Sequence, residues 1–219
     1  MPRALFEKTG NAIFISHLDL MRLFQRAFKR AGLPLTHSGG FTPRPQVSIA
    51  LPLSVGVQSR CELLDFDLDG QLPPMEEILT KLNQALVPGV RVLEVYPDGR
   101  KIRDLALLEC AVELEYDNGI PAGAVDAITA LFARDSLVLE KKGKNGITEQ
   151  DIIPMIRRIA AAEQDANTLV LKALICCQNP ALNPGQLTAA IEKEIPAYRP
   201  DFAKISRLEV FDNNETIFR

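Results

Sequence analysis

The chain has 219 residues, of which 47% are hydrophobic and 24% are charged, a balance that is ordinary for a folded globular protein. This length is enough for one large domain or two small ones with a substantial apolar core. No apolar stretch approaches the length that spans a membrane, and the first residues contain no apolar leader. We therefore expect a cytoplasmic protein with no membrane partner.

The cysteines argue against a metal centre. They are Cys61, Cys110, Cys176 and Cys177, and no two of them form a CxxC pair. Zinc sites and iron–sulfur clusters need several cysteines or histidines at short, regular spacings, and a disulfide framework is equally unsupported by this pattern. We expect no metal and no cofactor in this chain.

The net charge of −3 hides an asymmetry along the chain. Residues 1–60 hold 8 Lys and Arg against 2 Asp and Glu, whereas the remaining residues hold 17 against 26. A basic first quarter on an acidic body indicates an anionic ligand at that end of the chain. The alternative is that the basic face docks onto an acidic protein surface, which includes the second half of this chain.

The first 98 residues predict the element order β-α-β-β-α-β, with an opening hairpin counted as one element. Alternating apolar side chains indicate the strands, and apolar residues three and four apart indicate the helices. This order is that of the ferredoxin-like split βαβ unit, in which two helices pack on one face of an antiparallel sheet. The expected strands are 4–15 (the hairpin), 47–53, 61–68 and 90–95, and the expected helices are 17–31 and 73–86.

A short link at 98–101 leads to a second region, 104–219, in which the same order recurs. An extra helix is expected at 151–162, with Asp151 as its cap and Pro154 in its first turn. We therefore predict an α+β protein with two ferredoxin-like split βαβ units, antiparallel sheets and helices on one face. The other expected elements of the second unit are strands at 111–116, 136–140, 169–176 and 205–211, and helices at 121–132 and 186–195.

The helix predicted at 17–31 has an apolar face and a basic face. Ser16 is a good N-cap, and Asp19 suits the positive end of the helix and can reach back to the cap. Residues four apart stack into one stripe along a helix. The basic stripe is Arg22, Arg26 and Arg30, with Lys29 beside it, and the buried face is Leu20, Leu23, Phe24, Ala27, Phe28 and Ala31.

A loop with two glycines and two prolines follows this helix. Glycine leaves backbone N–H groups accessible and proline fixes φ, so such a loop can present donors to an anion. Arginine binds phosphate through two parallel hydrogen bonds. We therefore predict an anion site on the helix stripe and the loop, with a solvated helix face as the alternative. Its residues are Arg22, Arg26, Arg30, Ser38, Gly39, Gly40, Phe41 and Arg44.

Three stretches, at 16–24, 38–45 and 51–57, resemble the radical SAM-linked family. They read Ser-His-Leu-Asp-Leu-Met-Arg-Leu-Phe, Ser-Gly-Gly-Phe-Thr-Pro-Arg-Pro and Leu-Pro-Leu-Ser-Val-Gly-Val. The family is a domain of unknown function whose members are encoded beside, or fused to, a radical SAM protein with a cobalamin-binding-type domain. The resemblance implies such a protein as the partner. Because this chain lacks the three-cysteine signature of a radical SAM enzyme, we expect it not to perform that chemistry alone.

One departure from the family pattern limits what the resemblance implies about the loop. The family loop usually reads Asn-Pro-His-Pro, whereas this chain has Thr42-Pro43-Arg44-Pro45. A metal-binding or acid–base role of the family's loop histidine therefore does not carry over to Arg44, whereas a cationic contact does.

Three functions are compatible with these residues. The first is a non-catalytic accessory module that binds an anionic substrate, with RNA as our expectation, for the radical SAM partner. The second is an RNA-processing endoribonuclease that uses His17 as acid or base, by fold-level analogy with CRISPR-type endoribonucleases. The alternative role of His17 is to cap the helix or to bind the following loop. The third function is a protein–protein adaptor, and we expect no catalytic activity from the chain alone.

RNA binding by a split βαβ sheet usually relies on exposed aromatic side chains of its strands. This chain has 10 Phe, 3 Tyr and no Trp, and it has no stacking motif on a predicted strand. Phe41 in the loop is the candidate for stacking, so the expected RNA contact is mainly electrostatic.

Overall fold

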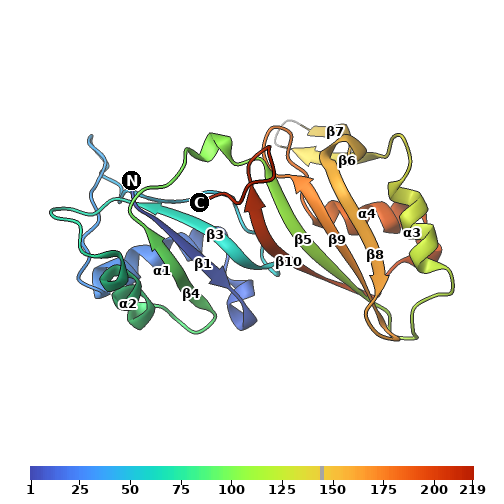
Figure 1. Ribbon diagram of the computed structural model, residues 1–219, viewed down its shortest axis with the longest axis horizontal. Coiled ribbons are helices and arrows are strands. Elements are labelled where there is room, and N and C mark those ends of the chain that lie inside the picture. Colours follow the sequence, from blue (N-terminus) through green and yellow to red (C-terminus); the bar gives the residue numbers. More distant parts are fainter. Residues whose placement is uncertain (144–145) are drawn as a thin grey trace. The chain divides into compact units, whose positions relative to one another are not determined.

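The protein is described by a computed structural model that covers residues 1–143 and 146–219. The chain divides into two compact units, residues 1–104 with 217–219 and residues 105–216. Paired strands within each unit run antiparallel and are accompanied by two α-helices, so the protein belongs to the α+β class (Figure 1). No helix in the described part of the chain is long and apolar enough to cross a membrane.

The first unit has the strand order β4-β1-β3-β2, which is the order of the split βαβ unit. β1 lies between β3 and β4, and the short β2 pairs with the other side of β3. The elements are β1 (Arg3–Lys8), the 3₁₀ helix η1 (Gly10–Phe14), α1 (His17–Arg30), β2 (Val47–Ile49), β3 (Gln58–Phe66), α2 (Met75–Ala85), β4 (Val90–Tyr96) and the 3₁₀ helix η2 (Ile102–Asp104).

The core of the first unit lies between its two helices and one face of its sheet. The apolar face of α1 faces this core as its spacing predicted, with Phe24 and Phe28 fully buried. Phe24 meets Phe6 of β1 edge to face, with ring centroids 4.8 Å apart. Ile78 and Leu82 of α2 complete the same cluster. This packing fixes α1 on the sheet, which leaves its basic face toward solvent.

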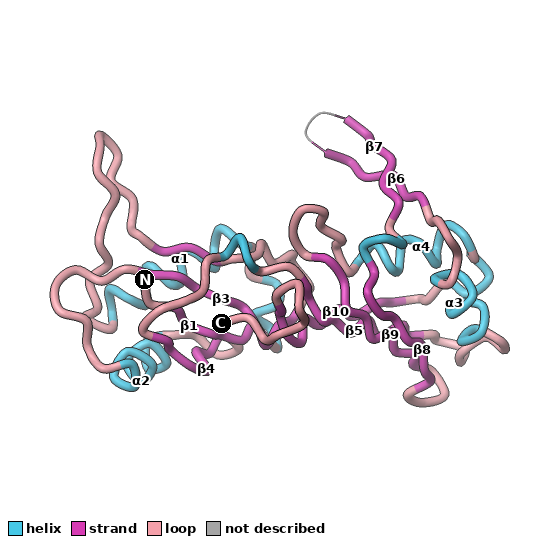
Figure 2. The backbone as a smooth tube through the Cα atoms, turned by 45° about the horizontal axis from the view of Figure 1, so that its top comes forward, coloured by secondary structure: helices cyan, strands magenta, loops and turns pink. Residues whose placement is uncertain are grey.

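The second unit repeats the topology with the strand order β10-β5-β9-β8. Its two helices contact each other and bury their apolar residues. In the sequence, a hairpin of β6 and β7 lies between α3 and β8. This hairpin projects away from the sheet (Figure 2). The elements are β5 (Leu107–Glu115), α3 (Ala124–Phe132), β6 (Val138–Gly143), β7 (Gly146–Asp151), the 3₁₀ helix η3 (Ile153–Met155), β8 (Ile156–Glu163), β9 (Thr168–Cys176), α4 (Gly185–Glu194), the 3₁₀ helix η4 (Pro196–Tyr198) and β10 (Phe202–Phe211).

The prediction of an extra helix at 151–162 is wrong. The Asp151 carboxylate does accept the backbone N–H of Ile153 at 3.1 Å, as a cap would, but it also accepts that of Leu137 at 2.9 Å. Only the single 3₁₀ turn η3 follows, and residues 156–163 then form β8 along β9. Pairing with β9 overrides the helix propensity of an alanine-rich stretch.

Two strands of the first unit are shorter than the pattern predicted. The expected second arm of the opening hairpin is the 3₁₀ helix η1, whose end is held by a hydrogen bond from Lys8 Nζ to the Ile15 carbonyl, 2.8 Å long. The strand expected at 47–53 is the three-residue β2. Ala50 N still donates to the Leu63 carbonyl at 2.9 Å, but Pro52, which has no N–H, cannot continue the ladder. The topology is unchanged, since β2 keeps its place beside β3.

Candidate functional site

The first turn of α1 is held by a small network of polar side chains. The Ser16 hydroxyl accepts the backbone N–H of Asp19 at 3.2 Å and donates to the Asp19 carboxylate at 2.7 Å. Arg22 Nη1 donates to the same carboxylate at 3.0 Å. The hydrogen bond from the Ser16 hydroxyl is the largest cause that lowers the pKa of Asp19 from its usual value of 3.8, and the hydrogen bond from Arg22 is the next. The predicted cap is present, with the hydroxyl rather than the backbone N–H of Ser16 bound to the carboxylate.

The chain leaves α1 at Gly32, which has a left-handed φ of +66°, and folds back beside the helix. Leu35 pairs with Leu68 and His37 with Pro45, each as an isolated antiparallel bridge. The loop therefore begins as a two-stranded stem, with a narrow tip that projects beyond the stem (Figures 1 and 2).

The loop tip carries five of the predicted site residues. The Ser38 hydroxyl accepts the backbone N–H of Arg44 at 3.1 Å, and Ser38 N donates to the Arg44 carbonyl at 2.9 Å, which closes the tip. Gly40 has φ +109°, a conformation that other residues rarely adopt, and Phe41 next to it is fully exposed. An exposed phenylalanine at the end of a closed loop is available to an external partner.

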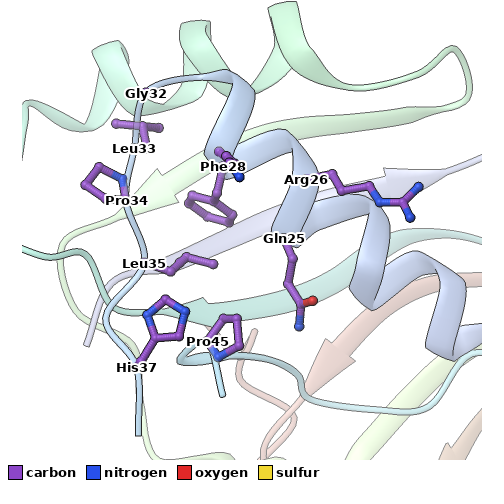
Figure 3. A pocket seen from close by; sticks show the side chains of 10 residues that line it. Gln25, Arg26, Phe28, Gly32, Leu33, Pro34, Leu35, His37 and Pro45 are labelled. Carbon is purple, nitrogen blue, oxygen red and sulfur yellow. The ribbon is translucent and has the colours of Figure 1, made fainter. Parts of the chain in front are cut away.

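An open groove of about 530 Å³ lies between α1 and the segment that follows it (Figure 3). Its inner surface is apolar, with Gln25 and His37 as polar groups beside it (Figure 3). Lys29 of α1 also lines it. Every residue that lines it belongs to the first unit. The lining residues are Gln25, Arg26, Phe28, Lys29, Gly32, Leu33, Pro34, Leu35, His37 and Pro45.

The three arginines of the predicted stripe differ in their side-chain contacts. Arg22 is held by Asp19, and Arg30 Nη2 donates to the Ala85 carbonyl at the end of α2, at 2.6 Å. Arg26 borders the groove, and its guanidinium extends away from the apolar lining (Figure 3). Within residues 1–143 and 146–219, neither Arg26 nor Lys29 makes a side-chain hydrogen bond or ion pair. Two cations beside the groove are thus available to a ligand.

His17 lies in the first turn of α1, two turns before the groove. It is half-buried, and its Nδ1 is enclosed without a hydrogen-bond partner among the described residues. Gln25, the groove residue nearest to it in the helix, is eight residues away, which corresponds to about 12 Å along the axis. The structure therefore does not bring His17 to the groove.

Sequence reasoning missed the apolar part of this site. In the sequence, Leu33, Pro34 and Leu35 look like ordinary loop residues. The sequence predicts for Pro45 only that it fixes φ in the loop. The one local signal is the helix end at Gly32 followed at once by apolar residues, which indicates that the chain returns along its own helix. Among the described residues, no group of three His, Cys, Asp or Glu side chains could hold a metal ion.

The sequence profile of a protein family described as "Uncharacterized protein conserved in bacteria (DUF2344)" matches residues 2–184. No curated protein sequence matches the chain.

The solved structures that match the chain include two that cover most of it. The "Crystal Structure of a Cbf5-Nop10-Gar1 Complex" matches 97% of this chain at 9% identity, with a TM-score of 0.52, and this chain spans 50% of that one. At that identity the similarity shows an α+β fold and no activity. The "Crystal Structure of an Unknown Protein from Galdieria sulphuraria" matches at 12% identity over 96% of both chains, with a TM-score of 0.27, too low to bear on the fold.

Proposed function

This chain belongs to the DUF2344 family of uncharacterized proteins conserved in bacteria, and we propose that it is a non-catalytic module that binds RNA for a radical SAM partner enzyme. The observation that carries the proposal is a set of cations beside an open groove that make no side-chain hydrogen bond or ion pair among the described residues. Arg26 and Lys29 lie on the helix side of this groove, and Arg44 lies in the loop beyond it. Phosphate groups are the ligands that such cations bind best.

The charges of the first unit support an anionic ligand. Arg22 and Arg30 are used within the protein, whereas no side-chain hydrogen bond or ion pair of Arg26, Lys29 or Arg44 occurs among the described residues. Arg26 acts on the Asp19 carboxylate only at a distance, by helping to lower its pKa. Exposed cations that make no direct contact within the described part of the fold are available for a contact outside it. The exposed Phe41 adds a ring on which a base can stack, as in proteins that bind single-stranded RNA.

The partner in this proposal comes from the resemblance of the three motifs to the radical SAM-linked family. The chain has four cysteines with no CxxC pair, so the radical chemistry belongs to the partner. The role that remains for this chain is to hold the substrate. A radical SAM protein with a cobalamin-binding-type domain is the partner that we propose.

The proposal is tested by binding of a fluorescently labelled single-stranded RNA across a salt series. We expect affinity to fall steeply as salt rises, because phosphate contacts release counterions. A variant with both Arg26→Glu and Lys29→Glu should bind at least about tenfold more weakly. Arg91→Glu combined with Lys101→Glu is the matched control, because it reverses the same number of charges. Arg91, on the edge strand β4, and Lys101 are exposed cations of the first unit that do not line the groove. No binding by the unaltered protein at low salt would contradict the proposal.

An RNA-cleaving enzyme is the second candidate, and the enclosed, unpartnered Nδ1 of His17 is the observation that favours it. In that case the wild type would shorten the labelled RNA, and His17→Ala would bind it without cleavage. A base held in the groove would not itself meet the imidazole, because His17 lies about 12 Å away along α1, so cleavage would need a strand that extends from the groove along the helix.

A protein adaptor is the third candidate. Phe14, Leu18 and Val55 are exposed apolar side chains near the start of α1, where Gly56 N donates to the Ile13 carbonyl at 2.9 Å. Exposed apolar side chains that lie together favour a protein contact. The adaptor is the better account if RNA fails to bind at low salt while a radical SAM protein co-purifies with the wild type and not with Leu18→Asp.

A further inference from the structure

The apolar groove has a size and a shape that suit part of a nucleotide. Its volume of about 530 Å³ lies within the range of roughly 300–1,000 Å³ that is usual for small-molecule sites. One wall is α1, and the other is the segment from Gly32 to His37 with Pro45 beside it (Figure 3). Leu33 and Leu35 pack into the core of the first unit, and the small part of their surface that stays exposed forms the floor of the groove.

The outer wall of the groove is held in place before any ligand binds. Thr36 N donates to the Asp67 carbonyl at 3.0 Å, and its hydroxyl donates to the Asp67 carboxylate at 2.9 Å. Gln46 N donates to the Thr36 carbonyl at 2.8 Å. These bonds fix the residues on both sides of the His37–Pro45 bridge. A preformed wall avoids the entropy cost of ordering a loop when the ligand arrives.

The lining combines three kinds of group. The floor is apolar, the Pro34 and Pro45 rings are flat surfaces, and the Gln25 amide and the His37 imidazole lie beside them (Figure 3). In the described part of the chain, neither of these polar side chains makes a hydrogen bond. Lys29 and Arg26 add positive charge on the helix side. The matching ligand has a flat apolar body, a hydrogen-bonding edge and an attached negative charge.

We propose that the groove holds one unstacked base of a single-stranded RNA, and this inference rests on the RNA-binding function proposed above. The base lies against Leu35 and the two prolines, and its edge meets the Gln25 amide, which offers both a donor and an acceptor. Its phosphate lies toward Lys29, and Arg26, whose guanidinium extends away from the lining, meets the next phosphate of the strand. An aliphatic ligand would leave the Gln25 amide and the two cations unused, and a cationic ligand would be repelled.

This arrangement makes the protein selective for unpaired RNA. A duplex keeps its bases stacked and paired, so none of them can enter the groove. A single strand, a loop or a bulge can turn one base outward at a small cost. The amide of Gln25 then distinguishes bases by their edges, so the four homopolymers bind with different affinities.

The test uses leucine methyl NMR on the whole protein with two nine-residue probes of equal charge. One probe is a uridine nonamer, and the other is the same ribose-phosphate chain without bases. We expect the uridine nonamer to bind about tenfold more tightly, since a buried base adds stacking and apolar contact. It should shift the methyl signals of Leu33 and Leu35, because a base ring lies against them, while those of Leu131 in the second unit stay unchanged.

A variant supplies the second measurement. Gln25→Leu keeps the helix and the apolar lining but removes the amide. This variant should still bind RNA, while the ratio between its highest and lowest affinity for the four homopolymers falls to about twofold. RNA binding that depends on Arg26 and Lys29 but leaves the Leu33 and Leu35 methyl signals unchanged would overturn the groove proposal and leave the RNA-binding function standing. Absence of binding by both nonamers at low salt would overturn the RNA-binding function itself.

Discussion

Asp19 is the residue on which the start of α1 depends. Its carboxylate accepts the Ser16 hydroxyl and the Arg22 guanidinium, and it lies near the positive end of the helix. Each of these contacts favours the charged form, which is why the pKa of Asp19 is lowered. The charge of Asp19 therefore stabilises the folded state, and the same contact removes Arg22 from the cations available to a ligand.

We predict that Asp19→Asn lowers the midpoint of urea unfolding at neutral pH and that this difference disappears in acid. The folded-state pKa lies below the usual 3.8, so the stabilisation is complete well above that pH. It is lost as the pH falls through the lowered pKa, where the folded wild type also becomes neutral at this position. Urea unfolding at several pH values measures the effect, and a difference that stays constant down to the lowest pH would contradict it.

At the scale of elements, the turn between α2 and β4 is set by a close backbone approach. Gly89 has φ +86° and accepts the Thr9 N–H through its carbonyl at 2.8 Å. A Cβ on Gly89 would lie 2.5 Å from the Thr9 carbonyl oxygen and 2.9 Å from the Ala12 Cβ. The turn thus presses directly against η1, and only glycine fits there.

We predict that Gly89→Ala destabilises the first unit more than Gly56→Ala does. Gly56 has nearly the same φ, +83°, but a Cβ there meets no heavy atom within 4 Å. Both variants lose about 1–2 kcal/mol of unfolding free energy from the left-handed conformation. Gly89→Ala loses about 1–3 kcal/mol more through the clash. Urea unfolding of the two variants gives this difference directly, and equal losses would refute the close approach.

The segment 151–163 forms a strand although its local sequence favours a helix. Its alanines favour a helix, and Asp151 is placed as a helix cap. The carboxylate instead joins the Leu137 and Ile153 N–H groups, and the strand that follows pairs along its length with β9. The ladder with β9 satisfies the backbone groups on one side of this strand, and β8 forms the edge of the second unit's sheet.

At the scale of the whole molecule, the last residues of the chain belong to the first unit. Phe218 is fully buried, with the guanidinium carbons of Arg3 and Arg100 5.4 Å and 4.9 Å from its ring centre. Arg3 also binds both carboxylate oxygens of Asp65, at 2.6 Å and 3.0 Å. Phe218 therefore packs against the buried Arg3, whose ion pair with the half-buried Asp65 joins β1 to β3.

We predict that Phe218→Ala lowers the unfolding free energy of the first unit by about 3–5 kcal/mol, because it opens a cavity beside a buried charge. Hydrogen exchange followed by mass spectrometry should show faster exchange in β1 and β3, with β5 and β9 little changed. Phe202→Ala is the control, since Phe202 on β10 is exposed. Equal acceleration of exchange in the two units would contradict the assignment of Phe218 to the first unit.

Sequence patterns were sufficient for features that depend on near neighbours. The cap at Ser16, the apolar face of α1 and the end of this helix at Gly32 all follow from residues within one or two turns. The β-α-β-β-α-β order of the first unit also follows from local periodicity, and it was enough to predict the α+β class. In the second unit the predicted strand at 136–140 is part of the separate β6–β7 hairpin, and β8 takes its place in the sheet.

Only the tertiary structure decided which residues could form a site. Arg22, Arg26 and Arg30 are equivalent in the sequence, yet Arg30 is held by the Ala85 carbonyl, 55 residues away. The groove exists because Leu35 pairs with Leu68, which brings Leu33 and Pro34 beside α1. Such contacts join residues far apart in the chain, and local propensity carries no information about them. The amino-acid pattern thus determined the helices and most strands, while long-range pairing determined which cations are left for a ligand.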